Sequence, residues 1–89
     1  MVSKTVKVNN SLGIHLRPAG KLADAGMKFS CAIHLVRNEK VVNGKSLLSI
    51  LSLGIKKGYE VEIQCDGKDE QEALDTFVKI LEESDAGDA

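Results

Sequence analysis

Leu12-Gly13-Ile14-His15-Leu16-Arg17-Pro18-Ala19 is the stretch at which the hydrophobic pattern of the chain changes from that of a strand to that of a helix. Apolar and polar residues alternate over residues 2–8, which predicts a half-buried strand. Apolar residues then recur every three or four positions, which predicts a helix over residues 16–27. Pro18 fits only the first turn of a helix, because a missing N–H costs no hydrogen bond there. The stretch therefore predicts a turn from strand into helix that carries a histidine and an arginine.

Three further strands are expected after this helix. Residues 31–37 and 40–43 alternate on either side of Asn38-Glu39, which predicts two strands joined by a tight turn. Residues 59–65 show the clearest alternation and predict the last strand. The positions expected to face inward on these strands are Cys31, Ile33, Leu35, Val61, Ile63 and Cys65.

Capping residues mark two further helices. Ser46 is a good N-cap and Gly54 a good C′ residue for a short helix. Asp69 and Glu72 have the spacing of a capping box before an apolar stripe, which predicts a longer amphipathic helix. The two helices are expected over residues 46–53 and 70–83.

The resulting order, β-α-β-β-α-β-α, predicts an α+β fold. Strands joined partly by hairpins and partly by helices indicate a mostly antiparallel four-stranded sheet, covered on one face by three helices. Eighty-nine residues make one domain over residues 1–89, with residues 84–89 as a frayed acidic tail. The content of 43% hydrophobic and 3% aromatic residues predicts an aliphatic core.

The formal net charge of −1 conceals an uneven distribution of charge. Residues 1–59 hold ten Lys or Arg against two Asp or Glu, whereas residues 60–89 hold two against eleven. The basic residues are scattered and not interleaved with aromatic residues, which argues against a nucleic-acid partner. Two interpretations stay open, a solvated charged surface and an acidic protein that docks near Arg17, Lys21 and Lys45.

The sequence gives no indication of secretion or of a membrane span. Met1–Asn10 lacks the apolar core of a signal peptide, and no apolar run approaches the ~20 residues that cross a bilayer. Cys31 and Cys65 form no motif, which favours buried reduced thiols over a disulfide. We therefore expect a soluble cytoplasmic protein.

His15 is the candidate reactive residue. No metal site is expected, because Cys31 and His34 fall on opposite faces of a strand. A helix N-terminus favours an anion, and Arg17 can grip phosphate oxygens through two N–H groups. Gly13 would keep bulk away from one side of the imidazole, whose lone pair can attack phosphorus. We interpret His15 as a phosphoryl carrier; the alternative is a surface histidine that caps the helix.

Ser46 also has two interpretations. It is either only an N-cap, or an N-cap that is also phosphorylated for regulation. A phosphate there would add about two negative charges beside the apolar side chains that follow. Those side chains exceed what one buried stripe requires, so some of Leu47, Leu48 and Leu51 are expected at the surface.

With these residues the chain resembles the HPr family, the histidine-containing phosphocarrier proteins of the bacterial phosphoenolpyruvate-dependent phosphotransferase system. The resemblance covers nearly the whole length. Its motifs are Gly13-Ile14-His15-Leu16-Arg17-Pro18-Ala19, Val42-Asn43-Gly44-Lys45-Ser46-Leu47-Leu48, Leu51-Ser52-Leu53-Gly54, Lys57-Gly58 and Asp66-Gly67.

The resemblance implies an open-faced β-sandwich and a monomeric stoichiometric carrier without a cofactor, rather than an enzyme. His15 would accept phosphate on Nδ1 from enzyme I, itself charged by phosphoenolpyruvate, and donate it to IIA domains of sugar permeases. Arg17 would stabilise the phosphate. Ser46 matches the position that an ATP-dependent HPr kinase/phosphorylase modifies, which links the family to transcriptional regulators and carbon catabolite regulation. The implied partner-binding residues are Leu16, Gly20, Lys21, Lys45, Leu47, Leu48 and Leu51.

Two residues depart from the family pattern. Leu16 stands where the family usually has a small residue, and Asp24 stands where many relatives are basic. His15 excludes the regulatory branch that lacks the active histidine. The alternatives are a nitrogen-related regulatory phosphocarrier, against which the Lys45-Ser46 helix argues, and a non-catalytic binding module, which needs no histidine–arginine pair.

Overall fold

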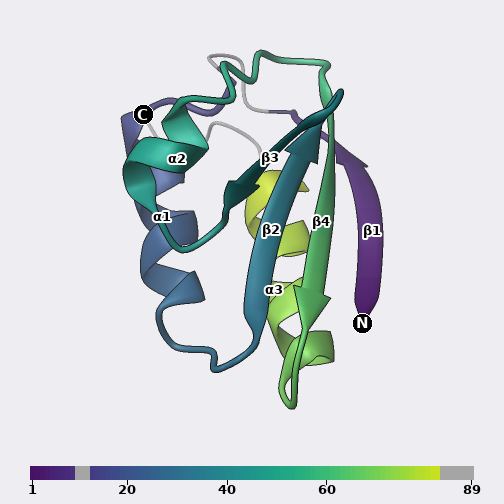
Figure 1. Ribbon diagram of the computed structural model, residues 1–89. Coiled ribbons are helices and arrows are strands. Elements are labelled where there is room, and N and C mark those ends of the chain that lie inside the picture. The colour runs from purple at the N-terminus through teal and green to yellow at the C-terminus, as the bar shows by residue number, and fades with distance from the viewer. Residues whose placement is uncertain (10–12, 83–89) are drawn as a thin grey trace.

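The computed structural model describes residues 1–9 and 13–82, which form an α+β fold with helices on one face of a single sheet (Figure 1). The described elements follow the expected order. They are β1 (Val2–Lys7), α1 (Leu16–Gly26), β2 (Ala32–Arg37), β3 (Lys40–Asn43), α2 (Leu47–Leu51), β4 (Glu60–Asp66) and α3 (Glu70–Glu82). The tail expected over residues 84–89 lies outside the described residues.

The sheet has the strand order β1-β4-β2-β3, and each neighbouring pair is antiparallel. The last strand of the chain therefore lies in the middle of the sheet. Val6 of β1 pairs with Val61 of β4, and Ile33 of β2 pairs with Cys65 of β4. Because residues opposite each other share a face, the inward positions of three strands meet on the side that the helices cover. The predicted open-faced sandwich is confirmed.

The core lies between this face of the sheet and the helices, and it is aliphatic apart from Phe77 and the two cysteines. Each large side chain buried in this way stabilises the fold by about 1.5–3 kcal/mol. The largest fully buried side chains are Phe77, Leu22, Ile33, Leu35, Ile50, Ile63, Val8, Val61, Cys31 and Cys65. All three helices contribute to this set, so α1 and α2 are both held against the sheet.

α2 is shorter than expected, because its helical backbone ends at Leu51 rather than at residue 53. Ser52 caps the helix, and the side chain of Leu53 is buried in the core. Gly54 adopts a left-handed backbone with φ of 63°. The glycine therefore ends a turn that follows the helix, instead of ending the helix itself.

Asp69 does not form the capping box that its spacing with Glu72 predicted. Its carboxylate accepts hydrogen bonds from the backbone N–H groups of Ser30 and Cys31, both at 2.9 Å. Donation from Ser30 holds the pKa of the Asp69 carboxyl below its usual value. The side chain thus joins the start of α3 to the connection between α1 and β2.

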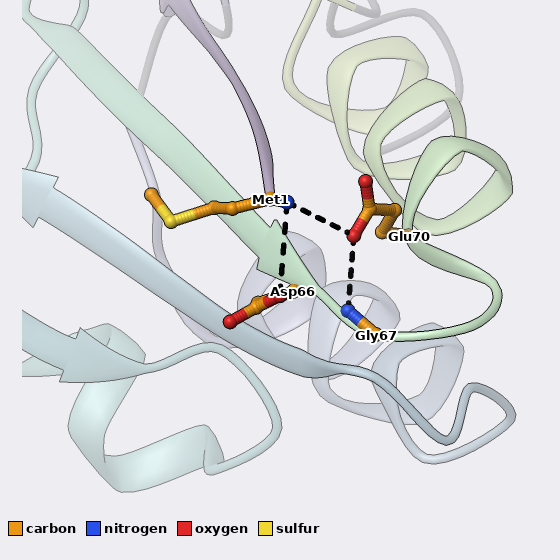
Figure 2. Close-up of polar contacts among 4 residues, drawn as sticks. All are labelled: Met1, Asp66, Gly67 and Glu70. Atoms are coloured by element: carbon orange, nitrogen blue, oxygen red, sulfur yellow. Dashed lines mark hydrogen bonds and ion pairs between the residues drawn. The ribbon is translucent and has the colours of Figure 1, made fainter.

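Glu70 makes the local contacts at the start of α3 (Figure 2). Its carboxylate accepts a hydrogen bond from the N–H of Gly67 at 3.1 Å, which lowers the pKa of Glu70. The ammonium nitrogen of Met1 lies 3.3 Å from Oε1 of Glu70 and 3.7 Å from Oδ1 of Asp66. These contacts tie the start of β1 to the connection between β4 and α3.

Cys31 and Cys65 are both buried and free, as the sequence favoured. Burial, and after it the neighbouring Cys31 thiol, raises the pKa of the Cys65 thiol to about 11. Neither thiol therefore has the thiolate character of a reactive cysteine. His34, by contrast, is exposed, so it lies apart from Cys31 as predicted.

The replacement Asp69→Asn should weaken the acid dependence of stability. Folding lowers the pKa of Asp69, so the unfolded chain takes up the proton first as the pH falls. The carboxylate therefore adds to the free energy of unfolding at pH values above its pKa in the unfolded chain, about 3.9. This contribution is lost as the pH falls through the lower pKa of the folded state. Urea unfolding should show the variant less stable at pH 7, with the difference shrinking toward pH 2. Asp75→Asn on the exposed side of α3 is the control, and an equal effect there would contradict the assignment.

Candidate functional site

His15 occupies the N-cap position of α1 with an extended backbone, φ −105° and ψ −167°. Its side chain makes no capping hydrogen bond to the described residues, so His15 caps the helix by its backbone position and not through the imidazole. The backbone hydrogen bonds of the helix begin with the N–H of Ala19, which donates to the His15 carbonyl at 3.0 Å. Pro18 lies in the first turn, as predicted.

The two ring nitrogens of His15 are not equivalent. Nε2 is buried and has no hydrogen-bond partner among the described residues, although the residue as a whole is partly exposed. A molecule that approaches from outside the fold cannot reach this nitrogen. Any chemistry of the imidazole with a second molecule therefore falls to Nδ1.

The turn before His15 is anchored to the segment that follows α2. The N–H of Ile14 donates to the carbonyl of Ile55 at 3.0 Å, and both side chains are buried. Gly13 has φ of 71°, and a Cβ atom at this position would lie 2.2 Å from the Ile55 oxygen and 2.6 Å from Cα of Lys56. The expectation that Gly13 clears space beside the imidazole is therefore wrong. The glycine is needed because two backbones touch there.

The start of α1 combines exposed apolar and basic side chains. Leu16 is 65% exposed, and Arg17 and Lys21 are exposed while making polar contacts of their own. A Cβ atom at Gly20 would meet no described atom within 4 Å, so this position faces open space. The first turn has no acidic residue, so no carboxylate of that turn offsets the positive end of the helix dipole.

Ser46 is the N-cap of α2, as predicted. Its Oγ accepts a hydrogen bond from the N–H of Ser49 at 3.3 Å. Leu48 is 78% exposed, whereas Leu47 and Leu51 are half-buried against the core. α2 packs beside α1 (Figure 1), so the two groups of expected partner-binding residues lie on neighbouring helices.

Lys45, expected from the sequence to contact a partner, also makes hydrogen bonds within the fold. Its Nζ donates to the carbonyl of Phe29 at 2.7 Å, and its backbone N–H donates to Oδ1 of Asn43 at 2.9 Å. The ammonium group thus binds the carbonyl of a residue just after α1. This contact makes Lys45 a link between two connections of the fold.

Ile55 is the supporting residue that sequence reasoning missed. It acts through its backbone carbonyl, and every residue type has one, so no residue pattern marks it. Among the described residues there is no group of three metal-ligating side chains. Within the same ranges, no helix is long and apolar enough to cross a membrane.

Comparison with known proteins gives the same family that the motifs indicated. A family model described as the PTS HPr component phosphorylation site matches residues 2–83. Phosphocarrier protein HPr of Mycoplasma capricolum subsp. capricolum is 40% identical over 74 residues, which is 83% of each chain. A crystal structure of HPr-C-His from Thermoanaerobacter tengcongensis has a TM-score of 0.88 at 36% identity, over 92% of each chain. An HPr dimer from that organism has a TM-score of 0.73 at 36% identity, over 92% of this chain and 94% of that one.

The family model and the solved structure each match nearly all of the chain, and the structure shares its fold. The chain belongs to the HPr family, the phosphocarrier proteins of the phosphotransferase system. Proteins of this family are phosphocarriers rather than catalysts.

The replacement Gly13→Ala should destabilise the fold more than Gly54→Ala. Both glycines have positive φ, which costs a residue with a side chain about 1–3 kcal/mol. Only at Gly13 would the new Cβ atom also collide with a backbone, because no described atom lies within 4 Å of the corresponding position at Gly54. The free energies of unfolding in urea measure the difference. Equal losses in the two variants would contradict the proposed contact with Ile55.

Proposed function

We propose that this chain accepts a phosphoryl group on Nδ1 of His15 from enzyme I and passes it to IIA domains of sugar permeases. The observation that carries the proposal is the position of His15 at the N-terminus of α1 with Nε2 buried. That burial leaves Nδ1 as the nitrogen for attack on phosphorus. Family membership supports the same assignment.

The chemistry is a transfer between two carriers. The lone pair of Nδ1 forms a bond to phosphorus while the bond from phosphorus to enzyme I breaks, and the phosphoryl group later leaves to an acceptor in the IIA domain. The N-terminus of α1 stabilises a nearby anion by about 0.3–1 kcal/mol. Arg17, two residues along, adds a permanent cation that can bind two phosphate oxygens. These terms protect the phosphohistidine without making it too stable to transfer.

Partners dock on the surface formed by α1 and α2. Leu16 and Leu48 supply exposed apolar contact area, and the open space at Gly20 permits close approach. The excess of basic residues before residue 60 favours acidic partners. The remaining proposed contacts come from Lys21, Lys45, Leu47 and Leu51.

The carrier works in the cytoplasm as a monomer, with neither a cofactor nor a nucleic-acid partner. Its substrates are other proteins, so one partly exposed histidine and one docking surface suffice. Two thiols that are buried and free accord with a reducing compartment. The dimeric relative makes oligomeric state a useful measurement beside the transfer assay.

Incubation with phosphoenolpyruvate and enzyme I from the same organism should phosphorylate the chain to about one phosphate per molecule. The phosphate should be labile in acid and stable in base, and it should be absent from His15→Ala. Nitrogen-15 NMR of the imidazole should place phosphorus on Nδ1. His34→Ala is the matched control, because His34 is exposed on β2. Failure of His15 to accept phosphate from the cognate enzyme would refute the proposal.

We also infer that Ser46 is a regulatory phosphorylation site for an ATP-dependent HPr kinase/phosphorylase. Its hydroxyl is the N-cap of α2, and the exposed Leu48 lies two positions further along the chain. A phosphate there adds about two negative charges beside this part of the docking surface. An acidic partner would then be repelled, and transcriptional regulators could read the modified form.

Ser46→Asp should slow the charging of His15 by at least about tenfold, which corresponds to a loss of 1.4 kcal/mol in docking. Ser46→Asn is the matched control, because Asn and Asp are comparable N-caps and only Asp carries charge. The measurement is the rate of phosphohistidine formation with enzyme I. Equal rates for Ser46→Asp and wild type would remove the regulatory role.

A further inference from the structure

The segment from Leu53 to Tyr59 forms backbone hydrogen bonds with the residues that precede His15. Val8, just after β1, donates its N–H to the Tyr59 carbonyl and accepts from the N–H of Gly58, both at 2.9 Å. Ile14 donates to the carbonyl of Ile55 at 3.0 Å. Val8 and Ile14, which lie on either side of residues 9–13, are therefore both hydrogen-bonded to this one segment.

Arg37, the last residue of β2, contacts both ends of the same segment. Its Nη1 donates to the carbonyl of Leu53 at 3.4 Å, and its guanidinium carbon lies 4.2 Å from the centroid of the Tyr59 ring. Leu53 and Tyr59 are the two ends of the segment. Arginine suits this position because its planar group can stack on a ring and donate in its own plane at once.

Lys40 makes a related contact that does not span the segment. Its Nζ donates to the carbonyl of Ser52 at 2.8 Å, at the C-terminal end of α2. Both cations leave the same β2–β3 hairpin, yet only Arg37 reaches Tyr59 among the contacts described. Lys40 and Arg37 can therefore be compared directly. Lys40 anchors the end of α2, whereas Arg37 anchors the segment from Leu53 to Tyr59.

We propose that Arg37 is a positioning residue for phosphoryl transfer at His15. It holds the two ends of the segment from Leu53 to Tyr59 together, which we call the closure of the segment. The Ile55 carbonyl then stays in place to accept the hydrogen bond from Ile14. His15, the next residue, thereby keeps the orientation that phosphoryl transfer needs. The role of Arg37 in phosphoryl transfer rests on the function proposed above. Its role in holding the segment from Leu53 to Tyr59 does not.

Amide hydrogen exchange of the Ile14 N–H tests the closure directly. In Arg37→Ala this amide should exchange about three- to tenfold faster, the range expected for loss of a half-buried cation–π contact. The amides of β4 in the sheet should change no more than global stability requires. Tyr59→Leu should reproduce the effect from the other side, and Tyr59→Phe should not, because it keeps the ring. Unchanged exchange at Ile14 in both Arg37→Ala and Tyr59→Leu would overturn the proposal.

Steady-state charging by enzyme I separates positioning from docking. Arg37→Ala should lower kcat about three- to tenfold at unchanged KM, while Lys40→Ala should leave kcat unchanged. Leu48→Ala should instead raise KM, because Leu48 lies on the proposed docking surface. A change in KM alone for Arg37→Ala would overturn the positioning role. If wild type were not charged at all, the proposed function would fail, and the exchange of Ile14 would still decide whether Arg37 closes the segment.

Discussion

The hydrogen bond from the Ile14 N–H to the Ile55 carbonyl is the constraint on which the functional end of the molecule depends. It joins the residues just before α1 to the segment after α2, two parts of the chain separated by two strands and two helices. The contact is close because Gly13 has no Cβ and accepts φ of 71°. The start of α1, with His15 as its N-cap, is thereby fixed relative to α2. The start of α1 and the neighbouring α2 together form the surface on which we propose that partners dock.

Charged side chains that bind backbone groups hold much of the remaining frame. Asp69 accepts from the N–H groups that precede β2, Lys45 donates to the carbonyl after α1, and Lys40 donates to the end of α2. Such bonds satisfy the backbone groups that helices and strands leave unpaired at their ends. A chain of 89 residues has a small core, so these links at the element ends matter for the relative placement of the helices.

On the proposed function, the site suits transfer more than storage. The imidazole is partly exposed at the N-terminus of α1, and Arg17 follows two residues along the chain. Leu16 and Leu48 give an exposed apolar area of modest size, which suits partners that must bind and leave. Leu16 is also where the chain departs from the usual small residue of its family. The extra apolar surface beside His15 is a point at which partner choice can differ from that of relatives.

The sequence by itself determined the elements, because hydrophobic periodicity, Pro18 near a helix start and Ser46 as an N-cap all act over a few residues. It also marked His15 and Arg17, since their chemistry depends on their neighbours in the chain. Only the tertiary structure decided which ring nitrogen is buried, why Gly13 is needed and what Asp69 and Lys45 bind. Each of these depends on contacts between distant residues, which the strand order β1-β4-β2-β3 brings together. A local pattern cannot encode that order. The spacing of Asp69 and Glu72 predicted a capping box, but the Asp69 carboxylate accepts hydrogen bonds from Ser30 and Cys31, which are distant in the sequence.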